Sequence, residues 1–484
     1  MAPQAQAAAA GNSVPKVLVI GAGAAGLVAA LELSREGLDV TVYEQTEEVG
    51  GLWVYTPETE SEPLGVDPQR RHVHSSMYRD LRTNLPREIM GYLDFPFLPK
   101  RGRDERRYPG CEEVKLYLKD FAEHYNLMRF IEFGVKVHYV GVKRGEANAY
   151  SENRDLKWIV RTSKVGANQV GEEIFDTVVI CIGHFFQPRV ISIPGAERWP
   201  GLHMHSHNYR IPEPFQDKVV VIIGNSKSGG DISKELIHVA KEVHICARNW
   251  PADNLSVSEA GPRKNTWHHP LVELACEDGT VKFQDGKSTK ADVIMQCTGY
   301  LYDFQFLDTQ GLISVEDGRV APLYKHVFVP ALAPSLSFVG LPSKILPFPL
   351  FQAQAKWIAK VLTGKVKLPS QSAMMADVEK YYLDLEAKGV PRHETLGLEL
   401  ETFEYVNWML HECGERQMNS WRRDIFLTTT LSKLAYPFDY REVWDDQELL
   451  DIANASLLEL SENLGIEGTQ GSGMSYANHF SCIV

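Results

Sequence analysis

Two stretches of the chain repeat the same order of apolar runs, glycine turns and amphipathic segments. Residues 17–20 and 220–223 are apolar runs rich in β-branched side chains, and each leads through a glycine turn into a segment of helical periodicity. A second such run follows at 40–43 and 243–246. Corresponding residues differ in number by 203 throughout, as do the turn glycines Gly21 and Gly224. The pattern predicts two copies of a βαβ unit.

The two copies also end alike. Residues 177–183 and 292–299 are apolar runs that close on a glycine, as buried strands often do. Between the copies, residues 187–216 contain five prolines, which favours an extended linker with little regular structure. Later in the chain, helical spacing occurs at 356–362, 374–388 and 403–413. We therefore expect an α/β protein with two Rossmann-like dinucleotide-binding domains, the second inserted into the first.

The first glycine turn has the composition of a dinucleotide-binding loop. It follows a predicted strand and opens a predicted helix, the context in which G-x-G-x-x-G is informative. Its glycines permit a tight turn and close approach of a pyrophosphate to the helix N-terminus. Glu44 ends the next strand, where a carboxylate binds the hydroxyls of an adenosine ribose. The alternative is a glycine turn beside an exposed glutamate. We expect an FAD site that comprises Gly21, Ala22, Gly23, Ala24, Ala25, Gly26, Glu44 and the later run Gly51, Leu52 and Trp53.

The second glycine turn is an incomplete match, because Ser226 stands where the middle glycine is expected. In the register of the repeat, Ala247 takes the place of Glu44, and Arg248 follows it. The carboxylate that would repel a 2′-phosphate is thus absent, and a guanidinium that can bind one is present. Arg248 as a solvated cation at a strand end is the alternative. We expect an NADPH site that comprises Gly224, Asn225, Ser226, Ser228, Gly229 and Arg248.

The charge and the distribution of apolar residues limit which partners and which location we expect for this protein. The formal net charge of −13 gives a polyanion no long-range attraction, so a nucleic-acid partner is not expected. The most apolar stretch, 327–350, is interrupted by five prolines, so we expect no membrane span. The first sixteen residues lack the features of a secretory signal. We expect a soluble, cytoplasmic protein.

The spacing of the cysteines and histidines argues against a redox-active disulfide and against a metal site. The seven cysteines include no C-x-x-C pair, so a flavin disulfide reductase, which needs a cysteine pair against the flavin, is disfavoured. His203, His205 and His207 alternate as metal ligands on a strand can, but no carboxylate or cysteine stands nearby, so we expect no metal site. The electrons of the flavin are then expected to pass to dioxygen or to a diffusible carrier.

The linker carries a motif of a known family. Residues 199–210, Trp-Pro-Gly-Leu-His-Met-His-Ser-His-Asn-Tyr-Arg, resemble the F-x-G-x-x-x-H-x-x-x-[YF] motif of flavin-containing monooxygenases, with Trp199 in place of Phe. Tyr209 closes the motif, where Baeyer–Villiger relatives typically carry Trp. Residues 81–88, 94–97 and 297–300 also resemble family segments, and the similarity extends over about 14–446. Residues 205–210 and the region from 421–422 to 444–446 look most like the plant, glucosinolate S-oxygenase-like branch, which oxidises thioethers.

The resemblance implies an NADPH-dependent enzyme that transfers one oxygen atom from a C4a-hydroperoxyflavin to a soft nucleophile, most readily a thioether sulfur. Dioxygen and a small-molecule thioether are the implied partners. Asn84 is the implied active-site amide; its alternative role is to serve a turn before Pro86. N-oxygenation, Baeyer–Villiger oxidation, an auxin-forming reaction on a 2-oxo acid and a non-catalytic nucleotide sensor stay open. The expected domains are FAD-binding at 15–205 and 301–464, where the latter has a helical C-terminal region, and NADPH-binding at 206–300. We expect flexible tails at 1–14 and 465–484.

Overall fold

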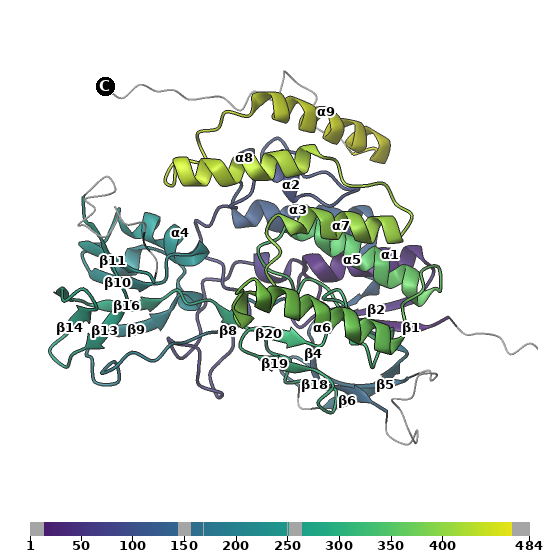
Figure 1. The fold of residues 1–484 in the computed structure, drawn as a ribbon, viewed down its shortest axis with the longest axis horizontal. Coiled ribbons are helices and arrows are strands. Elements are labelled where there is room, and N and C mark those ends of the chain that lie inside the picture. The colour runs from purple at the N-terminus through teal and green to yellow at the C-terminus, as the bar shows by residue number, and fades with distance from the viewer. Residues whose placement is uncertain (1–13, 144–155, 168, 249, 251–263, 467–484) are drawn as a thin grey trace, which may run out of the picture. The chain divides into compact units, whose positions relative to one another are not determined.

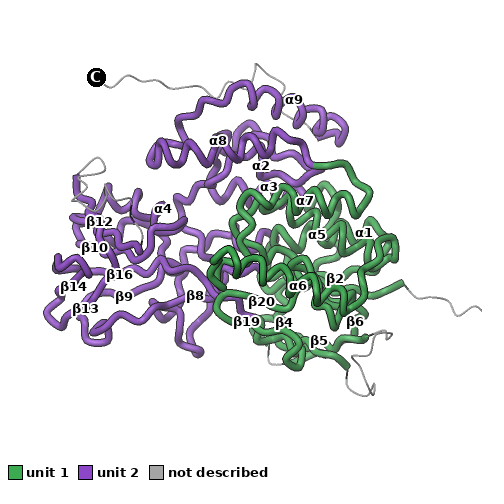
Figure 2. The backbone as a smooth tube through the Cα atoms, viewed as in Figure 1, with its two compact units in different colours: residues 1–48, 122–182, 304–417 green, residues 49–121, 183–303, 418–484 purple. Residues whose placement is uncertain are grey.

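The computed structural model describes residues 14–143, 156–167, 169–248, 250 and 264–466 (Figure 1). Apart from residues 14, 465 and 466, the two predicted tails lie outside these ranges. The chain forms two compact units (Figure 2). The first comprises residues 1–48, 122–182 and 304–417, and the second comprises 49–121, 183–303 and 418–484. Each unit contains one of the two predicted βαβ repeats.

The first unit is built on a parallel sheet with the strand order β21-β7-β1-β2-β3. The central strand pairs with β2 and β7 along its length, and its side chains Val17, Leu18 and Val19 are fully buried. Burial on both faces explains why the strand is apolar at every position rather than at alternate ones. The strands of this sheet are β1 (Lys16–Ile20), β2 (Asp39–Tyr43), β3 (Ile131–Glu132), β7 (Thr177–Ile180) and β21 (Leu336–Phe338).

Helices of the first unit confirm the predicted helical segments. Helix α5 packs on α1, where the Gln352 amide donates to the buried Glu32 carboxylate at 2.9 Å. Pro347 and Pro349 lie in the first turn of α5, where the missing N–H groups cost nothing. The helices are α1 (Ala24–Arg35), α5 (Pro347–Leu362), α6 (Gln371–Ala387) and α7 (Glu401–Glu412), with short turns η2 (Leu127–Phe130) and η6 (Arg392–Glu394).

Smaller sheets complete the first unit. Strands β4, β5 and β6 form an antiparallel meander, and β18 adds to β4 in parallel. Strands β19 and β20 form a separate hairpin. Their bounds are β4 (Val135–Val142), β5 (Trp158–Lys164), β6 (Val170–Phe175), β18 (Leu307–Asp308), β19 (Ser314–Glu316) and β20 (Arg319–Ala321).

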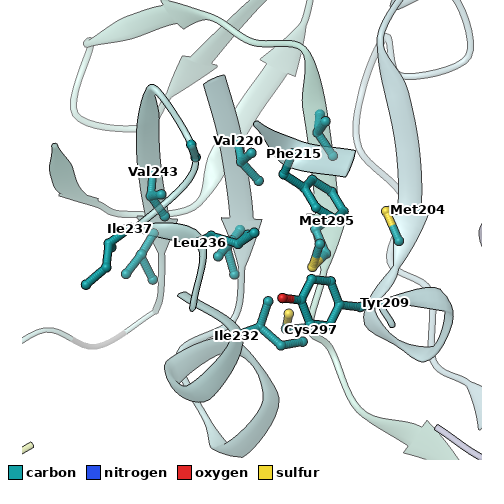
Figure 3. Close-up of a cluster of buried hydrophobic side chains, with 14 of the residues drawn as sticks. Met204, Tyr209, Phe215, Val220, Ile232, Leu236, Ile237, Val243, Met295 and Cys297 are labelled. Atoms are coloured by element: carbon teal, nitrogen blue, oxygen red, sulfur yellow. The ribbon is translucent and has the colours of Figure 1, made fainter. Parts of the chain in front are cut away.

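The second unit repeats the parallel sheet, with the order β12-β11-β10-β16-β9. Its core joins Val220, Val243 and Met295 of the strands to Ile232 and Leu236 of α4 (Figure 3). The bounds are β9 (Leu202–His205), β10 (Val219–Ile223), β11 (Glu242–Cys246), β12 (Thr266–His269), β16 (Val293–Gln296) and α4 (Lys227–Leu236).

The linker prediction was wrong at β9. We expected residues 187–216 to have little regular structure, but Leu202–His205 pairs with β16 as a parallel edge strand. The local Leu-His-Met-His sequence can pair because the linker prolines lie outside it. Met204 then packs into the core of the second sheet. The start of the linker forms β8 (Gln187–Pro188), which pairs with β17 (Tyr300–Leu301), and its end includes η3 (Ser206–Asn208) and η4 (Glu213–Phe215).

The remaining elements of the second unit are an antiparallel sheet and helices. The sheet comprises β13 (Val272–Ala275), β14 (Thr280–Phe283) and β15 (Ser288–Lys290). The helical elements are η1 (Gly51–Trp53), α2 (Arg87–Met90), α8 (Trp421–Ala435) and α9 (Gln447–Leu464), while α3 (Cys111–His124) includes residues assigned to both units. In the part of the chain that the structure describes, no helix is long and apolar enough to cross a membrane.

Candidate functional site: two glycine turns and an asparagine segment

The first glycine turn brings the start of α1 against the end of β1. Gly21 has φ +102°, and its N–H donates to the Tyr43 carbonyl at 2.8 Å. A Cβ on Gly21 would lie 2.7 Å from the Cys181 carbonyl oxygen. A Cβ on Gly26 would lie only 1.8 Å from the Gly21 carbonyl oxygen. Both positions therefore require glycine, one for its conformation and space and the other for space alone.

The beginning of α1 is suited to a phosphate group. Its N-cap Gly23 has no side chain to bond the first N–H groups, and the first turn contains no acidic residue. The positive end of the helix is therefore not neutralised by side chains of its own first turn. This arrangement fits the pyrophosphate of a dinucleotide such as FAD.

Glu44 is held beside this turn. Its carboxylate is 5% exposed and accepts from the Ala22 N–H at 2.7 Å. The other carboxylate oxygen accepts from the N–H and the hydroxyl of Thr46, both at 2.8 Å. A carboxylate offers about four acceptor sites, so capacity for a further hydroxyl donor is left. The expected alternative of an exposed glutamate is therefore wrong, and the carboxylate fits a ribose.

The second glycine turn reproduces the backbone geometry of the first. Gly224 has φ +105°, and its N–H donates to the Cys246 carbonyl at 2.8 Å. A Cβ on Gly229 would again lie 1.8 Å from the preceding turn carbonyl, that of Gly224. Helix α4 also begins without a side-chain cap and without an acidic residue in its first turn. The second turn thus has the same capacity for a pyrophosphate.

The structure explains why Ser226 can replace the middle glycine. The backbone of Ser226 is extended, with φ −93° and ψ −150°, and Gly23 in the first copy is similar, with φ −76° and ψ −172°. L-residues adopt this conformation without strain. At this position glycine is therefore not required by the backbone conformation.

Arg248 follows β11 and is exposed. Its guanidinium forms no ion pair with any residue in the described ranges. The His269 carbonyl accepts from the backbone N–H of Ala247, directly before Arg248, at 3.1 Å and from the side-chain indole of Trp250 at 2.8 Å. Residues 249 and 251–263 lie outside the described ranges.

The glycine pair at 50 and 51 forms a tight bend. Gly50 has φ +130° and Gly51 has φ +54°, and the short turn η1 follows. The Ser75 hydroxyl donates to the Leu52 carbonyl at 2.8 Å, which fixes the turn that leads to Trp53. The bend exposes backbone where side chains would otherwise stand, as close approach to a ligand requires.

Asn84 lies half-buried in a segment whose backbone is well fixed. The Thr83 N–H donates to the Pro109 carbonyl at 2.8 Å, and Arg82 Nε donates to the Tyr108 carbonyl at 2.9 Å. The Asn84 amide itself forms no hydrogen bond with any described residue. The alternative role of serving a turn before Pro86 therefore lacks the contact it would need, and the amide is available to a ligand.

The linker motif can be understood from its contacts. The Trp199 ring lies over Gly201, where a Cβ would approach it to 2.2 Å, so the aromatic-x-Gly spacing is a packing requirement. His205 is fully buried, and its Nδ1 accepts from the His207 N–H at 3.0 Å. Among the described residues, no group of His, Cys, Asp and Glu side chains could hold a metal ion.

The sequence analysis did not predict that two carboxylates of α4, Asp231 and Glu235, each accept a hydrogen bond from a tyrosine outside the helix. The Tyr78 hydroxyl donates to Asp231 and the Tyr209 hydroxyl donates to Glu235, each at 2.6 Å. The two tyrosine rings pack edge to face, with centroids 5.3 Å apart. Burial raises the pKa of Glu235 to about 7, against the hydrogen bond from Tyr209, which lowers it.

A signal for these pairs was present in the sequence. Asp231 and Glu235 are four residues apart, so they share a helix face, and it is not the face that carries Ile232 and Leu236.

The chain is similar to known proteins over most of its length. Residues 14–259 and 269–416 match the flavin-binding monooxygenase-like family. Flavin-containing monooxygenase FMO GS-OX-like 3 of Arabidopsis thaliana is 49% identical over 439 residues, which cover 90% of this chain and 96% of the relative. FMO GS-OX2 of the same organism is 48% identical, with 90% and 93% covered. The solved structure of S-allyl-L-cysteine S-oxygenase from Allium sativum is 46% identical to this chain, with a TM-score of 0.87. The match covers 92% of this chain and 99% of that one.

Proposed function

The chain belongs to the flavin-binding monooxygenase-like family, and from this premise we propose that it is an S-oxygenase acting on a small thioether. The enzyme uses FAD and NADPH. The proposed reaction converts a thioether, dioxygen, NADPH and a proton into a sulfoxide, NADP⁺ and water. Sulfur and NADPH each supply two electrons, and dioxygen accepts all four.

The similarity to a named S-oxygenase carries this proposal, because it covers 99% of that chain at 46% identity. Baeyer–Villiger and N-oxygenating reactions would use the same cofactors. Tyr209 argues against the first of these, since Baeyer–Villiger relatives typically carry a tryptophan at that position. A cytoplasmic location and the domain division at 15–205, 206–300 and 301–464 are parts of the same proposal.

We propose that the first fold and the glycine pair hold FAD. The turn from Gly21 through Ala22, Gly23, Ala24 and Ala25 to Gly26 brings the N-terminus of α1 to the pyrophosphate, and Glu44 accepts from the ribose hydroxyls. Gly51, Leu52 and Trp53 are the further residues predicted to bind FAD, and the tight bend there lets a ligand approach the backbone closely. When bound, FAD supplies the redox chemistry with dioxygen, and NADPH supplies the hydride.

We propose that the second fold holds NADPH. The N-terminus of α4 meets the pyrophosphate, and Asn225, Ser226 and Ser228 provide further donors between Gly224 and Gly229. Arg248 binds the 2′-phosphate through its planar guanidinium, because Ala247 removes the carboxylate that would repel it. A positive charge at residue 248 and no negative charge at residue 247 make the second site selective for NADPH over NADH.

Asn84 is the proposed active-site residue. Its amide, which bonds no described residue, can both donate and accept a hydrogen bond, so it can orient a group of the cofactor without itself gaining or losing a proton. No general acid or base of the chain is needed for oxygen transfer to sulfur, since the cofactor carries that step. The role of the protein is to orient and to exclude water.

Product analysis tests the proposed reaction. The purified holoenzyme is incubated with NADPH and ¹⁸O₂ and with S-allyl-L-cysteine, a tertiary amine, a cyclic ketone or an indolic 2-oxo acid. We expect a labelled sulfoxide in about equal amount to the NADPH consumed. A labelled ester, N-oxide or decarboxylated acid as the main product would overturn the S-oxygenase proposal. NADPH oxidation that no substrate accelerates would indicate the nucleotide sensor instead.

Replacing Asn84 tests the site. Both Asn84→Ala and the isosteric Asn84→Asp remove the N–H donor, so we expect flavin reduction by NADPH to persist while oxygen is diverted to hydrogen peroxide. The measurement is the ratio of sulfoxide to NADPH, with stopped-flow reduction of the flavin as the internal control. An unchanged ratio in both variants would remove Asn84 from the active site.

A further inference from the structure

The backbone that leads to Asn84 is held by a side chain from far along the chain. Arg441 Nε donates to the Thr83 carbonyl at 2.9 Å, and its Nη2 donates to the Arg82 carbonyl at 3.2 Å. The guanidinium is only 12% exposed. Both carbonyls directly precede Asn84, so the position of its amide depends on where Arg441 lies.

The same guanidinium is anchored to the second nucleotide fold. Arg441 Nη1 donates to Asp231 Oδ1 at 2.8 Å, and Asp231 lies on α4, the helix that begins at the second glycine turn. The other oxygen of Asp231 accepts from the Tyr78 hydroxyl at 2.6 Å. Asp231 is therefore bonded twice to residues 78–84, which we call the asparagine segment: directly at Tyr78, and through Arg441 at Arg82 and Thr83.

The repeated fold does not itself require this carboxylate. In the register of the repeat, Asp231 corresponds to Val28 of α1, which is fully buried and apolar. Arg441 lies beyond residue 416, where the match to the family model ends. Neither residue is explained by the fold or by the residues proposed to bind FAD and NADPH.

The region that carries Arg441, residues 422–446, is held in place by buried hydrogen bonds on both sides of that residue. Arg422 is buried and donates to the carbonyls of Ile89, Gly91 and Tyr92 at 2.9, 3.0 and 3.2 Å. Asp446 accepts from both terminal nitrogens of the buried Arg107 at 2.7 Å. These contacts lie on either side of Arg441 in the sequence, and buried charged groups would lose hydrogen-bond partners if residues 422–446 moved away.

We propose that Asp231 and Arg441 are positioning residues, which set the Asn84 amide in register with the helix that receives NADPH. A guanidinium suits this task because its planar fork can bond one carboxylate and two carbonyls at once. A shift of residues 422–446 or of α4 would then displace Asn84 without removing either cofactor. The proposal rests on the proposed role of Asn84.

The test compares Arg441→Met and Asp231→Asn with Arg423→Met, which changes an exposed arginine on α8. The readouts are the sulfoxide-to-NADPH ratio, the flavin content, the KM for NADPH and the melting temperature. We expect hydrogen peroxide per NADPH to rise roughly tenfold in both positioning variants, against the ~100-fold that a misplacement of about 1 Å can cost. Flavin content should stay at the level of the Arg423→Met control.

A double variant separates positioning from general support. If Asp231 and Arg441 act as one unit, the pair of substitutions should uncouple little more than either alone. Wild-type coupling in both single variants, or a lower melting temperature with unchanged coupling, would overturn the proposal. If Arg441→Met fails to fold, Tyr78→Phe and Asp231→Asn still decide it by the same ratio. Failure of the Asn84 variants to uncouple would instead refute the proposed active site.

Discussion

Replacing Gly229 by alanine should weaken NADPH binding while FAD stays bound. A Cβ at this position would lie 1.8 Å from the Gly224 carbonyl oxygen and 2.9 Å from its carbonyl carbon. Real contacts of this kind essentially never fall below 3.0 Å, so α4 and the turn must separate by more than an ångström. Gly224 has little freedom to retreat, because it packs against Cys297 and its own Cβ would lie 2.5 Å from that carbonyl.

The separation moves the helix N-terminus away from the phosphate that it is proposed to bind. Overpacking of this kind costs about 1–3 kcal/mol. If about 1.4 kcal/mol of that cost falls on nucleotide binding, the KM for NADPH rises roughly tenfold. The first fold is unchanged by the substitution, so the purified protein should remain yellow.

The chain offers a matched control in the next residue of the same helix. A Cβ on Gly230 would meet only Asn225 Oδ1, at an ordinary 3.5 Å, so Gly230→Ala should bind NADPH normally and gain up to ~1 kcal/mol of helix stability. The mirror variant, Gly26→Ala, has the same 1.8 Å approach to the Gly21 carbonyl and should be purified without flavin. Absorbance of bound flavin and the KM for NADPH measure both effects. Equal KM values for Gly229→Ala and Gly230→Ala would refute the reasoning.

Two further predictions concern charge. Arg248→Ala should raise the KM for NADPH far more than that for NADH, because only NADPH carries the 2′-phosphate; an equal rise for both would remove Arg248 from that site. Glu235 has its pKa raised from the ordinary 4.5 to about 7, so the folded state retains a proton that the unfolded state has lost, and stability falls as pH rises between these values. The change corresponds to about 3 kcal/mol. Glu235→Gln should therefore melt higher than the wild type at pH 8 and similarly near pH 4.5, and a difference independent of pH would contradict this account.

The fold could be predicted because its determinants are local. A buried parallel strand is apolar at every position, and the glycine turn is specified by residues close together in the sequence, so both βαβ units were predicted. The strand β9 was not, because the surrounding prolines suggested an irregular linker while its pairing depends on β16, far along the chain. Pairing partners at such separations are set by tertiary packing, which local patterns do not report.

The glycines of the candidate site could be predicted from the sequence, whereas the hydrogen bonds that hold the residues around Asn84 could not. The need for Gly26 and Gly229 follows from a packing rule that applies wherever this turn occurs. The hydrogen bonds of Asp231 to Tyr78 and Arg441 join three distant parts of the sequence, and no spacing rule relates them. The availability of the Asn84 amide is likewise a property of its surroundings, visible only once neighbouring donors and acceptors are placed.

A chain that contains the same fold twice supplies its own comparison. Where the two copies agree, as in the equal approach at Gly26 and Gly229, the shared feature belongs to the architecture of a dinucleotide site. Where the residues of the two copies differ, the shared fold does not explain the difference, so we attribute it to the different chemistry of the two sites. The acidic residue at 44 becomes alanine followed by arginine, which changes the nucleotide preferred, and the buried valine at 28 becomes Asp231, which adds a link to the asparagine segment. By this reasoning the second copy is the one adapted to couple cofactor binding to the active site, and substitutions that equalise the copies should abolish coupling before they abolish binding.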